Sequence, residues 1–180
     1  MRTKSAVTLV EVLAVISIIL VLTAILAPVV SSAKDQAAIV ASESNMRQLV
    51  SACVLYASDQ SDTGGPSGLG LPTNLVQLLK SRKLPKALFD THGNPEYVGG
   101  PPVYRYMPPA EKDAKGVLGQ AWIKHVDSTG NNPIILIDGT HNPTASETEF
   151  FRHRLVFGAY LSGSLRKQHL TGPYAVYERW

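Results

Sequence analysis

An uncharged apolar run near the N-terminus constrains this chain more than any other feature. Residues Val12–Val30 read VLAVISIILVLTAILAPVV, about nineteen residues without a charge. A helix of that length matches the roughly 30 Å hydrocarbon core of a bilayer. Arg2 and Lys4 precede the run, and basic residues beside a membrane helix tend to stay on the cytoplasmic side. The sequence therefore predicts a single membrane span, with the N-terminus inside and the remainder outside the cytoplasm.

One carboxylate stands at the front of this run. Glu11 lies between Val10 and Val12, where a charged side chain that enters the apolar zone is costly. Physics alone leaves two interpretations open. The carboxylate stays hydrated among the lipid headgroups, or it has a partner inside the membrane.

The residues around Glu11 form a pattern with specific spacing. Lys4–Leu13 reads KSAVTLVEVL: a basic leader, a small residue, then hydrophobic-Thr-Leu-hydrophobic-Glu leading into the apolar helix. This resembles the processing motif of the type IV pilin and type II secretion pseudopilin family. Ser44–Leu49 and Tyr56–Asp59 are similar to the segment after the membrane helix in many such proteins. The resemblance covers about the first third of the chain.

The resemblance implies roles for the N-terminal residues. A prepilin peptidase would cut between Ala6 and Val7 and methylate the new amino group of Val7. Glu11 would pair with the N-terminal amine of a neighbouring subunit. The partners would be sister subunits, the peptidase, an assembly platform of the inner (cytoplasmic) membrane and membrane lipid. The assembly segment would also include Thr8, Leu9 and Val10.

Two positions depart from the usual motif. Ala6 stands where the family commonly has Gly, and Val7 stands where it commonly has Phe. Ala is small enough to resemble the usual residue, so the cleavage site is kept and its efficiency stays open.

A different interpretation is an ordinary secretory signal, cut after Ala33 to release a soluble protein that begins at Lys34. The apolar run exceeds the 7–15 residues typical of such signals. An uncleaved membrane anchor is a further alternative.

The helical pattern continues beyond the apolar run. No Gly or Pro occurs between Pro28 and Gly64, and apolar residues of Met46–Ala57 recur at spacings of three and four. We expect one helix from Val7 to about Ala57, with a kink at Pro28 and with its last turns against a globular domain. Cys53, the only cysteine, falls in that stripe and is expected to pack as a small hydrophobe.

Composition divides the chain into five expected parts. They are a leader (1–6), a transmembrane assembly helix (7–30), its amphipathic continuation (31–60), a Gly/Pro loop (61–72) and a globular head (73–180). In the head, TNLVQLLK (73–80) predicts a short helix. A hairpin turn is expected at Ser162-Gly163. Apolar runs bounded by Pro and Gly predict short strands at 103–107, 122–126, 134–137, 155–161 and 174–177.

The expected architecture is α+β: a long N-terminal helix packed on a small antiparallel sheet, which is also the form of the pilin fold.

Without Arg2 and Lys4, the chain has 15 basic and 14 acidic residues, so no nucleic-acid partner is favoured. Asp138 and His141 invite a metal hypothesis, and Asp127 and Asn142 could add calcium ligands. No paired-His spacing or ligand-dense loop supports either metal. We predict no enzyme, cofactor or metal site.

The function expected from the sequence is structural. The subunit would be processed and would then assemble into a pilus-like or pseudopilus filament through its N-terminal helix, because repeated head-to-tail contacts generate open filaments. A second hypothesis is a minor tip subunit or adhesin, whose head would bind DNA, a surface or a secreted substrate.

Overall fold

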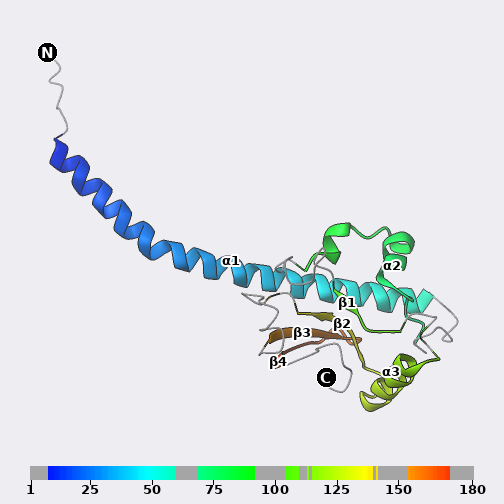
Figure 1. Ribbon diagram of the computed structural model, residues 1–180. Helices are drawn as coiled ribbons and strands as arrows, with labels where there is room; N and C mark the ends of the chain where they lie inside the picture. Colours follow the sequence, from blue (N-terminus) through cyan, green and yellow to red (C-terminus); the bar gives the residue numbers. More distant parts are fainter. Residues whose placement is uncertain are drawn as a thin grey trace. The chain divides into compact units, whose positions relative to one another are not determined.

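A computed structural model describes residues 8–59, 69–91, 104–109, 113, 115–139, 141 and 154–170. The chain divides into two compact units, one ending at Ala37 and the other beginning at Ala38. One helix, α1 (Leu9–Asp59), runs without interruption through both (Figure 1). The expected long helix is therefore confirmed, and it ends two residues later than the predicted Ala57.

The second unit is built on the part of α1 that follows Ala37. Its buried residues recur at helical spacing, so one face of the helix is covered while the opposite face is exposed. The buried apolar residues of this face belong to one hydrophobic core together with residues of the sheet. The buried residues of α1 are Ser42, Met46, Leu49, Val50, Ala52 and Cys53.

The sheet is antiparallel throughout, with the strand order β1-β2-β3-β4. The sequence of β2 is apolar except for its last residue, Asp138, and all five of its residues are buried. The register of β2 against β3 shifts between Ile134 and Leu136. The strands are β1 (Arg105–Tyr106), β2 (Ile134–Asp138), β3 (Arg154–Tyr160) and β4 (Leu165–Leu170).

The β3–β4 hairpin turns where the sequence predicts it. The N–H of Gly163 donates to the carbonyl of Tyr160, and the N–H of Tyr160 donates to the carbonyl of Ser164, both at 2.9 Å. Gly163 has φ +83°, a conformation that glycine adopts at little steric cost. This confirms the expected turn. The strand after it, β4, carries few apolar residues, and no apolar run in the sequence predicts it.

Two short helical elements follow the Gly/Pro-rich region. Helix α2 (Leu75–Arg82) is capped by Asn74, whose side chain accepts a hydrogen bond from the N–H of Gln77 at 3.1 Å. The Gln77 side chain accepts in turn from the N–H of Thr73 at 2.7 Å. These two hydrogen bonds stabilise the start of the short helix that the sequence predicts. A 3₁₀ helix, η1 (Lys86–Phe89), comes next.

The strand predicted at 122–126 is wrong, because these residues lie in helix α3 (Val117–Ser128). The buried residues of α3 are Gly119, Trp122, His125 and Val126, at spacings of three, three and one, which fit a helix and not a strand. A short apolar run does not distinguish the two by itself. The helix is closed by Gly130, at φ +61°. The predicted strand at 174–177 lies outside the described residues.

Together these elements form the α+β arrangement of a long N-terminal helix and a small antiparallel sheet that the sequence predicts. Within the described part of the loop region, Leu69–Pro72 is neither helix nor strand.

Cys53 is fully buried, and burial raises the pKa of its thiol to about 12. Because the thiolate is the reactive form, we predict that Cys53 reacts with a thiol reagent in the folded protein at least about a hundredfold more slowly than after denaturation. A cysteine placed at exposed Val54 in a Cys53→Ala background is the control and should react at once. Rapid labelling of native Cys53 would contradict the core placement.

His125 is a buried histidine, and its protonation is expected to destabilise the head. Its Nε2 accepts a hydrogen bond from the N–H of Ile134 at 3.1 Å, and burial lowers the pKa of the imidazole. The unfolded chain takes up the proton more readily, so the stabilisation is complete above about pH 6.5 and is lost as the pH falls below it. We predict that urea midpoints of the full chain in detergent decline between pH 7 and pH 5.

His125→Gln keeps an acceptor that does not titrate, so its decline should be clearly smaller. His169→Gln, on an exposed position of β4, is the matched control and should follow the wild type. Equal pH profiles for the wild type and His125→Gln would assign the acid sensitivity to other groups.

Candidate functional site: the N-terminal helix and its cap

The first unit consists, in its described part, of Thr8 and of α1 residues, all with exposed side chains. The large apolar side chains between Leu9 and Val30 range from 41% exposed at Val30 to 81% exposed at Leu9. Such surface is unfavourable in water, at about 25 cal/mol per Å². Helix α1 is long and apolar enough to cross a membrane, and none of its most apolar window is buried in the protein.

Thr8 and Glu11 form a reciprocal cap at the start of this helix. The backbone N–H of Thr8 donates to Glu11 Oε2 at 2.8 Å, and the Thr8 hydroxyl donates to the same oxygen at 2.9 Å. The N–H of Glu11 donates to Thr8 Oγ1 at 3.3 Å, and the carbonyl of Thr8 accepts from the N–H of Val12. Thr8 is thus the N-cap, and Glu11 is the acidic residue three positions later. We call this pair the Thr8–Glu11 cap.

The other polar side chains of the apolar segment are also satisfied within the helix. The Ser17 hydroxyl donates to the carbonyl of Leu13 at 2.8 Å. The Thr23 hydroxyl donates to the carbonyls of Ile19 and Leu20. Because a lipid interior offers no hydrogen-bonding partners, this internal satisfaction removes the main obstacle to placing these residues in a bilayer.

The structure brings together two of the expected assembly residues, Thr8 and Glu11, and places Leu9 and Val10 in the first turn with exposed side chains. The expected cleavage site, Ala6 and Val7, lies outside the described residues. Pro28 lies inside the continuous helix, and the kink expected there stays a prediction.

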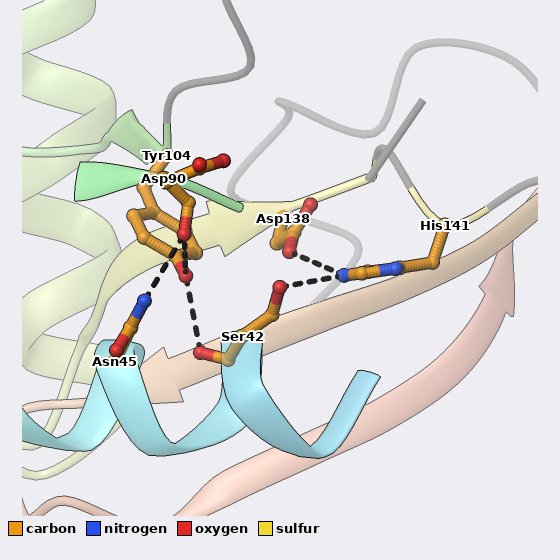
Figure 2. A network of polar contacts seen from close by, with 6 residues as sticks. All are labelled: Ser42, Asn45, Asp90, Tyr104, Asp138 and His141. Carbon is orange, nitrogen blue, oxygen red and sulfur yellow. Dashed lines mark hydrogen bonds and ion pairs between the residues drawn. The ribbon is translucent and has the colours of Figure 1, made fainter. Parts of the chain in front are cut away.

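The second unit contains a buried polar cluster around His141 (Figure 2). His141 Nε2 lies 2.8 Å from Ser42 Oγ and 3.1 Å from Asp138 Oδ2. The Tyr104 hydroxyl donates to the carbonyls of Ser42 and Asp90, at 3.2 and 3.0 Å. Burial raises the pKa of Tyr104, so its phenol stays protonated and able to donate.

The Ser42, His141 and Asp138 contacts do not make a nucleophilic triad. In such a triad the acid binds one ring nitrogen and the serine binds the other, so that the base can take the serine proton. Here both oxygens face the same atom, Nε2, and Ser42 is only 1% exposed. The geometry orients side chains within the fold and offers no attacking group to a substrate.

The metal hypothesis at these residues gains little from the structure. Asp138 and His141 do lie together, but no group of three His, Cys, Asp or Glu side chains that could hold an ion occurs in the described ranges. Asp127 is exposed on α3, and Asn142 lies outside the described residues. Two strong ligands do not complete a structural zinc or calcium site.

Sequence reasoning found Glu11 but missed its intrachain partner. The signal was present, because Thr8-Leu9-Val10-Glu11 fits the Ser/Thr-x-x-Glu pattern of a capping box. Ser42 and Tyr104 carried no comparable signal. Their contacts join residues 99 and 62 positions apart, and no local pattern encodes them.

Comparison of the chain with protein-family models, with curated proteins and with solved structures gives no match in any of the three. Function is therefore argued from the residues and their geometry.

The cap can be tested by substitution. Thr8→Val keeps the shape of the side chain but removes the hydroxyl that both donates to and accepts from Glu11. We predict that the amide of Glu11 then exchanges roughly fivefold faster in detergent micelles, measured by NMR, since an N-cap hydroxyl is lost. Thr8→Ser keeps the hydroxyl and should exchange like the wild type. Unchanged exchange in Thr8→Val would show that the cap does not protect this turn.

Proposed function

We propose that this chain is a structural subunit held in a membrane by the Leu9–Val30 part of α1, and that it assembles through the same segment into a pilus-like or pseudopilus filament. The observation that carries the proposal is the exposure of this segment on all sides, from 41% to 81% for its large apolar residues. In the membrane the segment would contact lipid. In the filament it would contact the same segment of sister subunits.

The sequence pattern from Lys4 to Leu13 supports the same proposal. A prepilin peptidase would cut after Ala6 on the cytoplasmic face, and the head would lie on the opposite side, as the basic residues of the leader favour. The mature chain would begin with methylated Val7. The assembled filament would extend from the inner membrane on the side of the head.

The Thr8–Glu11 cap gives Glu11 a defined state before assembly. A carboxylate at the edge of the hydrocarbon region needs hydrogen-bond donors, and the cap supplies two from the same chain. Both bonds use Oε2. A neighbour's amine would bind the carboxylate as a charge-assisted partner, which is a stronger interaction than a neutral hydrogen bond. Membrane residence and assembly would thus use the same residue with different partners.

The processing proposal predicts a specific N-terminus. Intact mass and N-terminal sequencing of the protein purified from its native membrane should give a chain that starts at N-methylated Val7. A chain that starts at Lys34 and is found in the soluble fraction would replace the proposal with a secreted domain. A chain that keeps Met1 in the membrane would indicate a simple anchor.

The pairing proposal predicts that Glu11→Ala inserts into the membrane normally but enters filaments at least about tenfold less, because it lacks the carboxylate for the incoming amine. The measurement is the filament fraction after shearing, compared with the membrane pool. Ser17→Ala is the matched control, since it removes a polar group of the same helix whose bond is internal. Normal incorporation of Glu11→Ala would overturn the pairing.

A further inference from the structure

The first fully buried side chain along α1 is a polar one. Residues up to Ala37 are exposed, Ala38 and Ile39 are half-buried, and Ser42 is the first fully buried residue, at 1% exposure. The buried apolar stripe begins one turn later, at Met46. The first buried turn of the helix therefore combines polar contacts to the head with one partly buried apolar side chain, Ile39, which packs against the core.

These contacts come from three separate segments of the chain (Figure 2). Ser42 is bound on its hydroxyl by His141 and on its carbonyl by Tyr104. One turn later, the Asn45 amide donates to the carbonyls of Asp90 and Ala87, at 3.1 and 3.3 Å. We call the set Ser42, Asn45, Tyr104, Asp138 and His141 the polar clasp.

His141 connects the clasp to the core. Its Nε2 lies between the α1 hydroxyl and Asp138 Oδ2, and its ring meets the Phe157 ring edge-on at 5.8 Å between centroids. Asp138 is 1% exposed at the end of β2. Removing His141 takes away the contact that Nε2 makes with the buried Ser42 hydroxyl and with the buried Asp138 carboxylate, and losing a buried polar contact costs more than losing an exposed hydrogen bond.

We propose that the polar clasp is a stop that fixes where α1 detaches from the head. With the clasp closed, the docked part of the helix begins at Ala38. With the clasp open, Ala38–Asn45 would separate from the head, about two turns or 12 Å of helix, and this separation would include the partial apolar contact of Ile39 with the core. Separation would halt at Met46, since the residues from there to Cys53 are held by the apolar core. This inference is independent of filament assembly.

The detachment has a measurable signature. A helical segment without tertiary contacts is marginal in water, so its amides exchange faster than those of a docked segment. We would follow hydrogen exchange by mass spectrometry on the full chain in detergent, comparing peptides that cover Ala38–Asn45 with peptides that cover Met46–Cys53. For His141→Ala we expect exchange at least about tenfold faster in the first segment, and a change within about twofold in the second.

Two further variants keep the test decisive if His141→Ala does not fold. Ser42→Ala removes only the hydroxyl that faces His141 and should accelerate the same segment to a smaller degree. His141→Gln returns amide donors near Ser42 and Asp138 and should restore slow exchange. Ser51→Ala is the control, because Ser51 is exposed on the same helix and donates to its own Arg47 carbonyl.

The proposal holds if acceleration is confined to Ala38–Asn45 in His141→Ala or Ser42→Ala and is absent in Ser51→Ala. Equal acceleration of both segments would mean that the clasp only adds to global stability. No acceleration in Ser42→Ala, together with none in His141→Ala, would mean that apolar contacts alone hold this turn. Either of these two results overturns the stop.

Discussion

The whole architecture depends on one helix that must suit two different surroundings. Over Leu9–Val30, α1 exposes apolar side chains on all sides, and over Ala38–Asp59 its buried residues lie on one face. A water-filled environment suits the second part and not the first. The polar exceptions in the first part, Glu11, Ser17 and Thr23, all bond within the helix. The buried face of the second part shares one hydrophobic core with the sheet, with α2 and with α3.

The features that could be predicted from sequence are those with a local physical signature. The uncharged run, the long stretch without Gly or Pro, and the apolar spacing after Met46 define α1 almost to the residue. The strand Ile134–Asp138 and the turn at Gly163 also have local causes, a continuous apolar run and a backbone with positive φ. In each case the local structure is determined by residues that are close together in the sequence.

The features that could not be predicted depend on distant partners. The segment around Trp122 was assigned to a strand because five residues are too few to reveal a helical period, and the burial of Gly119 and His125 settles it as a helix. Strand β4 is mostly polar and is held by its pairing with β3. The link between Ser42 and His141 depends on how α1 lies on the sheet. None of these follows from neighbours in the sequence.

The Thr8–Glu11 cap also bears on what proteolytic maturation would change chemically. The two donors to Glu11 in the cap are the amide of the Val7–Thr8 bond and the Thr8 hydroxyl, and a cut after Ala6 leaves both whole. The start of the helix and the hydrogen bonds of Glu11 would then be the same in precursor and product. Removal of the leader would take away Arg2 and Lys4 and place a cationic amine one residue before the cap. Maturation would thus move positive charge to the residue that directly precedes a capped helix start.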